Sequence, residues 1–153
     1  MAAPIEDPIA AWRSIVDLVQ ARVAGRDEAE LDRRADAESL TLREAVHHVA
    51  EANVVAASIV IAALGSPGCV YDWSWMLPFG PWMGRLRYGE KPLGPTLRLL
   101  AALNDYVAAL VEPLPDGLSR PVLLKDVPEG PPRATTVGEV LLAEALHARE
   151  HFG

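Results

Sequence analysis

The four histidines are the residues of this sequence best suited to chemistry, and they occur in two places. His47 and His48 are adjacent, whereas His147 and His151 lie near the end of the chain in the segment HAREH. On a helix, an i, i+4 pair projects both imidazoles from one face, with Cβ atoms about 5–6 Å apart. Two such rings can bind one metal ion, and a third histidine from another helix would leave coordination positions open for water or substrate. The pattern therefore indicates a metal site that includes the second pair and one member of the first.

Helical phase separates the two adjacent histidines. The positions three and four residues apart that share a face with His48 are all small or apolar: Ala45, Ala52, Val55, Ile59 and Ala62. The corresponding positions for His47 are mostly polar: Arg43, Glu51, Val54 and Ser58. We therefore expect His48 to point into the protein, and His47 to be solvated or at the edge of a helical bundle.

Two carboxylates could support such a site. Glu144 lies one turn before His147, and Glu51 lies one turn after the first pair of histidines. Either could accept a hydrogen bond from a histidine N–H or act as a base, as carboxylates beside metal ligands do. The alternative is that both are ordinary charged groups on a helix surface, and the histidines two partly buried imidazoles with local hydrogen bonds.

An aromatic segment separates the second and third predicted helices. Tyr71, Trp73 and Trp75 lie within a stretch rich in Gly and Pro, which excludes a long regular helix but not a short one. These three side chains could form the wall of a ligand pocket beside the metal. They could also pack over one end of the bundle or form a dimer contact.

Helix signals divide the chain into four main helices. Asp7-Pro8 opens the first, which stops near Gly25, and a capping box at Thr41–Glu44 opens the second, which continues to about residue 64. The third runs from about residue 94 to 112, and a second capping box, at residues 136–139, opens the fourth. Residues 120–127 are predicted to be extended. The sequence shows no set of strands that could build a sheet. The predicted fold is all-α: one domain over residues 1–153, an antiparallel four-helix bundle with long irregular connections.

Composition narrows the functional class. The 153 residues carry a formal net charge of −7 with no basic cluster, which disfavours nucleic-acid binding. The single cysteine, Cys69, excludes an internal disulfide framework and fits a reducing cytoplasm. The segment MAAPIEDPIAAW lacks the pattern of a signal peptide, and the apolar run Val54–Leu64 is too short to cross a bilayer. We expect a cytoplasmic protein that does not enter a membrane.

Simple bundle topology argues against a shared histidine site. His48 falls in the second turn of its helix, while His147 and His151 end theirs. In an up-down-up-down bundle the second and fourth helices are parallel, which would place these residues at opposite ends. A different helix order or an axial offset would remove the conflict.

The same residues resemble the DinB-like superfamily of small metal-dependent helical bundles, which includes S-transferases that use bacillithiol or mycothiol. The second helix of the family has the pattern small or apolar, H, apolar, A, acidic, A, and residues 46–52 of this sequence, VHHVAEA, are similar to it. The last helix of the family carries H-x-x-x-H followed by an apolar residue and Gly, and residues 147–153, HAREHFG, are similar to that motif. The resemblance implies that His48, His147 and His151 bind one ion of zinc, nickel, iron or manganese, with water in the remaining coordination positions. It also implies connections that are not simple up-down.

The sequence departs from the family pattern at its end. The motif normally continues into more helix, whereas this chain ends at Gly153, so His151 would lie in a last turn that we expect to fray. A bound metal ion could order that turn.

Two functional hypotheses follow. The first is a divalent-metal-binding DinB-like protein, a thiol S-transferase or a hydrolase acting on a small electrophile, with a small-molecule substrate and a low-molecular-weight thiol as partners. The second is a non-catalytic, small-ligand-binding or stress-related interaction module that forms a homodimer.

Overall fold

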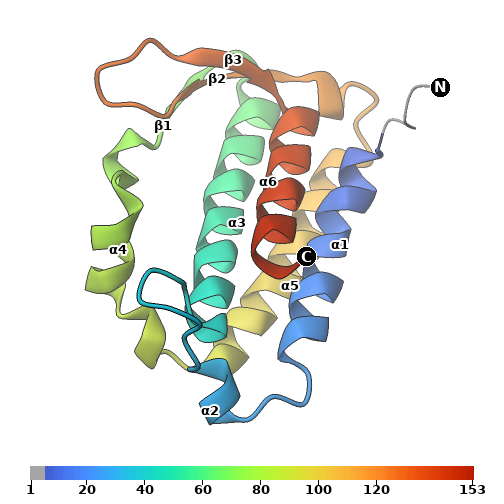
Figure 1. Ribbon diagram of the computed structural model, residues 1–153. Coiled ribbons are helices and arrows are strands. Elements are labelled where there is room, and N and C mark those ends of the chain that lie inside the picture. Colours follow the sequence, from blue (N-terminus) through green and yellow to red (C-terminus); the bar gives the residue numbers. More distant parts are fainter. Residues whose placement is uncertain (1–5) are drawn as a thin grey trace, which may run out of the picture.

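Four long helices form the core of the protein. The computed structural model describes residues 6–153 and places these helices side by side (Figure 1): α1 (Pro8–Val23), α3 (Leu42–Gly65), α5 (Leu93–Val111) and α6 (Val137–Phe152). Their bounds agree with the expected ones to within about two residues, and the all-α four-helix bundle is confirmed. Of the segment taken to exclude a signal peptide, residues 1–5 lie outside the described residues.

The predicted caps explain why the helices begin where they do. The side chain of Asp7 accepts a hydrogen bond from the N–H of Ile9 at 3.0 Å, and proline follows as the first residue of α1. Capping boxes open both α3 and α6, at Thr41 with Glu44 and at Thr136 with Glu139. In each box, hydroxyl and carboxylate satisfy backbone N–H groups that have no partner within the helix.

Helix order differs from a simple up-and-down bundle. Helices α3 and α5 run in the same direction, and α1 and α6 run in the opposite one (Figure 1). Two contacts near the start and middle of α3, His47 with Thr96 and Asn53 with Asn104, fix the parallel pair. His48 contacts His147, and Asn53, further along α3, contacts Glu144, earlier on α6, so α3 is antiparallel to α6. The expectation that these two helices are parallel was therefore wrong, and the topological objection to a shared histidine site no longer applies.

A long crossover makes the parallel pair possible. Between α3 and α5 the chain passes along the outside of α3 and returns to the end of the bundle where α3 began (Figure 1). Its elements are β1 (Val70–Asp72), the 3₁₀ helix η1 (Ser74–Met76), α4 (Phe79–Leu86) and the 3₁₀ helix η2 (Tyr88–Glu90). The short helix α4 agrees with the expectation that this segment could hold one.

A small sheet closes the end of the bundle where α6 begins. After the 3₁₀ helix η3 (Gly117–Ser119), strands β2 (Pro121–Lys125) and β3 (Arg133–Thr136) join β1 in the order β1-β2-β3. Strand β1 pairs parallel to β2, with Tyr71 opposite Leu124, and β2 pairs antiparallel to β3. The expectation of no sheet was wrong. These strands have only three to five residues each, too few to show an alternating pattern in the sequence. Strands this short, with one partner far away in sequence, leave little local pattern.

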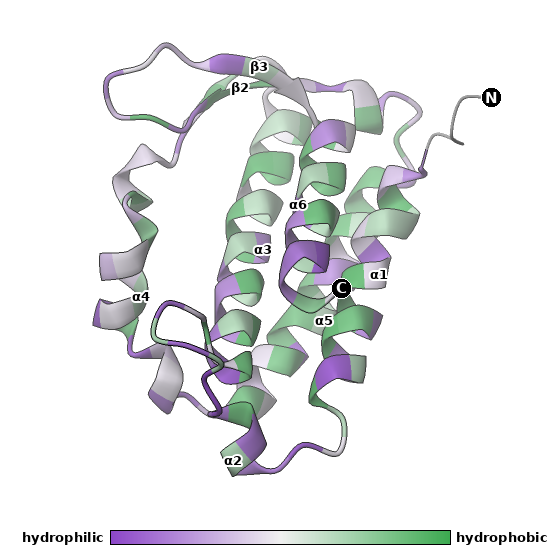
Figure 2. Cartoon of the chain, viewed as in Figure 1, coloured by the Kyte–Doolittle hydropathy of each residue, from purple (hydrophilic) through white to green (hydrophobic). Residues whose placement is uncertain are grey.

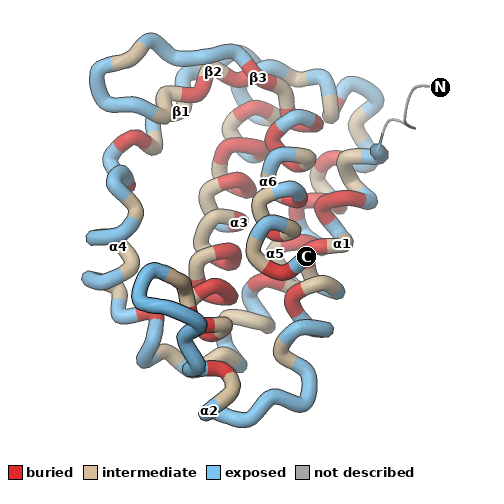
Figure 3. The backbone as a smooth tube through the Cα atoms, in the orientation of Figure 1, coloured by how far each residue is buried: buried red, intermediate tan, exposed pale blue. Residues whose placement is uncertain are grey.

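Hydrophobic side chains fill the space between the helices. Residues turned toward neighbouring helices are buried and mostly hydrophobic, whereas the 24–41 connection is mostly hydrophilic (Figures 2 and 3). By length and composition the whole of α3 could span a membrane, although the apolar run Val54–Leu64 within it is too short to do so. In this structure α3 packs against both α5 and α6, with 44% of its most apolar window buried. A central helix of a bundle has the same composition.

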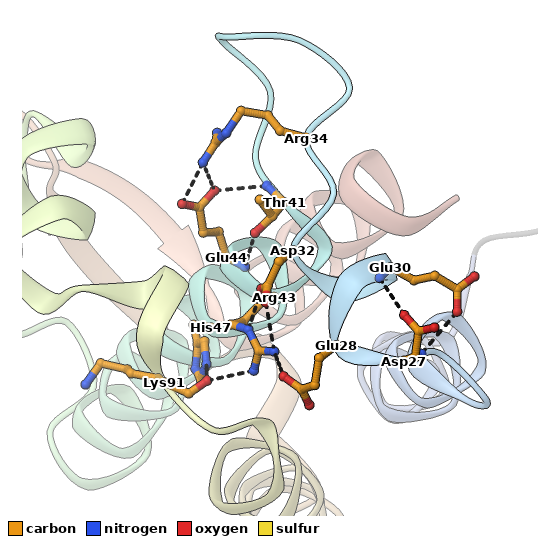
Figure 4. A network of polar contacts seen from close by, with 10 residues as sticks. All are labelled: Asp27, Glu28, Glu30, Asp32, Arg34, Thr41, Arg43, Glu44, His47 and Lys91. Atoms are coloured by element: carbon orange, nitrogen blue, oxygen red, sulfur yellow. Dashed lines mark hydrogen bonds and ion pairs between the residues drawn. The ribbon is translucent and has the colours of Figure 1, made fainter.

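A buried arginine ties the connections together at the other end. Arg43 is only 6% exposed and donates hydrogen bonds to Asp32 at 2.6 Å, to Glu28, and to the carbonyl of Lys91 at 3.1 Å (Figure 4). Glu28 belongs to a short helix, α2 (Glu28–Leu31), within the 24–41 connection. The guanidinium therefore fixes both the 24–41 connection and the end of the crossover to α3.

Loss of this arginine is expected to destabilise the fold. In Arg43→Met, the hydrogen bonds of a charged, buried group to three residues disappear, and the free energy of unfolding should fall by about 1.5–3 kcal/mol. Urea denaturation measures it. Arg13→Met is the matched control, because Arg13 and Glu112 form an ion pair with both side chains at least 43% exposed, worth less than about 1 kcal/mol. Equal losses in the two variants would contradict the assignment.

Candidate metal centre

Three histidines meet where α3 and α6 lie side by side. His48 comes from α3, and His147 and His151 come from consecutive turns of α6, with one possible ligand atom from each lying within 4.8 Å of the others. The ring centroids of the three pairs are 4.8, 4.9 and 4.9 Å apart, with the rings nearly perpendicular. The antiparallel arrangement of α3 and α6 brings the start of one helix to the end of the other.

Their spacing fits a metal ion. The Nε2 atoms of His48 and His147 are 2.9 Å apart. Two imidazole nitrogens that each lie about 2.0–2.1 Å from one ion, at angles between octahedral and tetrahedral, are separated by about 2.9–3.4 Å. A hydrogen bond between the rings gives the same distance, but it does not account for the third ring. The donor set therefore fits a divalent ion with open positions.

Glu144 orients His147. Its Oε1 lies 3.1 Å from His147 Nδ1, and this hydrogen bond raises the pKa of His147. When Nδ1 carries the proton that Glu144 accepts, Nε2 holds its lone pair toward the other two rings. Carboxylates bound to the remote nitrogen of a histidine ligand have the same effect in metal sites.

The other two rings are held without charge. Burial, followed by the charges of His147 and His151, lowers the pKa of His48 to about 4. Burial likewise lowers the pKa of His151. Both rings are thus neutral at neutral pH, the form that binds metal. The rings of Phe79 and His48 pack edge to face, with their centroids 4.7 Å apart. The Nδ1 atom of His48 is buried without a hydrogen-bond partner among residues 6–153.

The last turn of α6 is held in place by packing. Phe152 is 2% exposed and belongs to the core, and α6 includes His151 and continues through Phe152. The helix therefore includes His151 in this structure, and the buried aromatic side chain that follows it favours an ordered last turn.

A chain of buried amides lies behind Glu144. Asn53 Nδ2 donates to Glu144 Oε1 at 3.0 Å, and Asn104 Nδ2 donates to Asn53 Oδ1 at 3.2 Å. The indole N–H of Trp12 donates to the backbone carbonyl oxygen of Asn104 at 3.2 Å. The chain connects α1, α5, α3 and α6. Sequence reasoning missed it, although an asparagine within each of two apolar helices was the available signal.

A cavity of about 570 Å³ opens beside the histidines. Its lining includes side chains from α3, α6, the crossover and the sheet: His48, Ala52, Val55, Ala56, Ile59, Trp73, Met76, Leu77, Phe79, Leu124, Arg133, Ala134, Thr135, Glu139, Val140, Ala143, Glu144 and His147. Of the three aromatic residues expected to wall a pocket, Trp73 lines this cavity. Tyr71 is not among the lining residues, and Trp75 is 66% exposed and packs on Trp82.

Glu51 has a different role from the expected one. Its Oε2 accepts hydrogen bonds from Trp82 Nε1 at 3.2 Å and from the hydroxyl of Tyr88, so it fixes the crossover to α3. Burial and this carboxylate raise the pKa of Tyr88. Its recorded hydrogen bonds thus go to the crossover and to none of the three histidines.

His47 is buried, contrary to expectation. It is 3% exposed, with Nδ1 3.0 Å from the hydroxyl of Thr96 and Nε2 3.2 Å from the carbonyl of Lys91 (Figure 4). Burial lowers its pKa. The side chain of His47 is covered by α5 and the end of the crossover, so His47 is a structural residue with both nitrogens engaged.

Comparison with known proteins gives a likeness of fold. No protein-family model matches this sequence, and a search of curated proteins returns no match. Among solved structures, it is similar to YfiT from Bacillus subtilis, which is described as a probable metal-dependent hydrolase with an unusual four-helix bundle topology. The TM-score is 0.73, with 99% of this chain and 87% of that chain covered at 18% identity. At this identity the likeness shows a shared four-helix bundle fold.

Removal of the central amide is expected to weaken the fold. Asn53→Ala leaves the buried amide of Asn104 without its acceptor and Glu144 without one of its two donors, so the free energy of unfolding should fall by about 1–3 kcal/mol. Chemical denaturation gives the value. Ser58→Ala, on the same helix, removes a hydroxyl that donates an exposed hydrogen bond to the carbonyl of Val54 and should change stability by less than about 0.5 kcal/mol. If Asn53→Ala were as stable as Ser58→Ala, the amide chain would have no structural role.

Proposed function

We propose that this protein is a metal-dependent hydrolase of the DinB-like type, which holds one divalent ion through His48, His147 and His151. The observation that carries the proposal is the convergence of three imidazoles from two helices, within 4.8 Å of one another. The description of YfiT as a probable metal-dependent hydrolase supports the same reaction class. The order of helices, with a long crossover, agrees with the resemblance to that superfamily.

The residues around the site suit activation of a nucleophile. A divalent ion held there would supply a Lewis acid that makes a water or thiol nucleophilic at neutral pH. Glu144 sets the orientation of His147 through Oε1, while its Oε2 makes no hydrogen bond to residues 6–153. Because Glu144 also lines the cavity, Oε2 is placed to accept a proton from the nucleophile.

The finer reaction depends on which nucleophile enters. Water gives hydrolysis of a small electrophile, whereas a low-molecular-weight thiol gives the S-transfer that the family resemblance implies. Zinc, nickel, iron and manganese all suit imidazole ligands, and three imidazoles do not select among them. The cytoplasmic location and the homodimer remain predictions.

A second candidate, a non-catalytic ligand-binding module, is favoured by the cavity itself. Its size falls within the range of small-molecule sites, and its lining is mostly apolar. Elemental analysis of protein purified without chelators distinguishes the candidates. One equivalent of metal supports the first, and a folded, metal-free protein that does not take up added metal supports the second.

Substitution of the α3 ligand is expected to abolish metal binding. His48→Ala leaves two ligands from one helix, so stoichiometric binding of zinc or nickel in calorimetry should be lost. The matched control is His47→Gln, which keeps a polar side chain beside Thr96 and Lys91 and should bind one equivalent. Retention of one equivalent by His48→Ala, with circular dichroism unchanged, would remove His48 from the site.

Substitution of the orienting carboxylate should weaken binding without abolishing it. Glu144→Gln keeps the size of the side chain but removes the charge that holds the Nδ1 proton of His147, so metal affinity should fall about 10–100-fold. Glu150→Gln removes the same charge from an exposed position next to His151 on the same helix. Equal losses in the two variants would show a general effect of charge rather than orientation of His147.

A further inference from the structure

We propose that the cavity beside the histidines binds an uncharged, elongated and largely apolar small molecule, whose reactive polar group lies at the histidine end. The assignment of that end rests on the proposed function, whereas binding of the apolar body does not. Both can be measured separately, as set out below.

The walls are apolar over most of their length. Val55 and Ile59 of α3, Trp73 and Phe79 of the crossover, and Leu124 of β2 all line the cavity. The crossover and the sheet enclose this side of the bundle (Figure 1). A ligand that enters removes apolar surface from water on both sides, which favours binding by about 25 cal/mol for each Å² buried.

The cavity is elongated along the helices. On α3 its lining extends from His48 to Ile59, and on α6 from Glu139 to His147. At 1.5 Å per residue these spans are about 12–17 Å. The histidines lie at one end, and Glu139, which begins α6 beside the sheet, lies at the other. An occupant that fills this space therefore has an apolar body and places one end at the histidines.

The charged groups in the lining are already paired within the protein. Arg133 donates to Asp126 at 2.7 Å, and Glu139 accepts hydrogen bonds from Thr135 and from the start of α6. Glu144 accepts from Asn53 and His147. Apart from the histidines and the metal ion proposed there, the lining offers an anionic ligand two carboxylates and one arginine that already pairs with Asp126. A cationic one would be desolvated against apolar walls beside carboxylates that already accept hydrogen bonds.

The binding experiment uses N-phenyl-1-naphthylamine, an uncharged apolar fluorescent probe, with the purified protein both as isolated and in the presence of EDTA. We expect saturable binding at one site under both conditions. Ile59→Trp, which fills the cavity at a position 5% exposed, should weaken binding at least tenfold. Ile61→Trp introduces the same side chain two residues away, at a position 45% exposed, and should bind as the unmodified protein does.

A second variant covers the case in which Ile59→Trp does not fold. Ala143→Phe adds bulk at an exposed position of α6 that also lines the cavity, and it should weaken probe binding while the metal stoichiometry is unchanged. If the unmodified protein does not bind the probe, or if the folded Ala143→Phe and Ile59→Trp variants bind it unchanged, the pocket assignment is overturned. Metal uptake in the same samples tests the proposed function independently.

Charge selectivity is tested, in the presence of EDTA, by competition among three ligands of similar shape. Methyl 2-naphthoate is neutral, 2-naphthoate is anionic and 2-naphthylmethylammonium is cationic. We expect the neutral ester to displace the probe at least tenfold more effectively than either ion. Equal or better displacement by one of the ions would overturn the assignment of an uncharged ligand, while leaving the metal site unaffected.

Discussion

The antiparallel packing of α3 against α6 is the constraint on which the candidate site depends. His48 lies near the start of one helix and the other two histidines near the end of the other, and the opposite directions of the two helices bring them together. The crossover over residues 66–92 permits this arrangement, because it returns the chain to the end where α3 began. Helix α5 then runs parallel to α3, and α6 must run back along it.

Within this packing, a few polar side chains cross an otherwise apolar core. Asn53 and Asn104 are 0% and 2% exposed, and each buried amide costs free energy unless it is hydrogen-bonded. They bond to each other, and Asn53 bonds onward to Glu144, which bonds to His147. Such a chain holds its members in one arrangement, since rotation of any of them leaves a buried group unpaired. The core thus contributes to the orientation of the site as well as to stability.

The crossover connects two helices and also forms part of the site. Glu51 holds it through Tyr88 and Trp82, while Phe79 packs on His48 and Trp73 lines the cavity. One side of this segment therefore faces α3 and the histidines, whereas Trp75 remains exposed. Because the crossover is anchored on α3 itself, the cavity wall and the histidine of that helix keep a fixed relation to each other.

The sequence by itself determined the four helices, their caps and which three histidines are candidates for the site. These features depend on local hydrogen bonds and on the period of a helix, both of which are readable from neighbouring residues. The tertiary structure decided the direction of α6, the sheet, the burial of His47 and Arg43, and which aromatic residue lines the cavity. Each of these depends on a partner far away in sequence, as Tyr71 depends on Leu124 and His47 on Thr96. Helical phase gives the direction of a side chain from its own helix, but only packing places a partner in that direction.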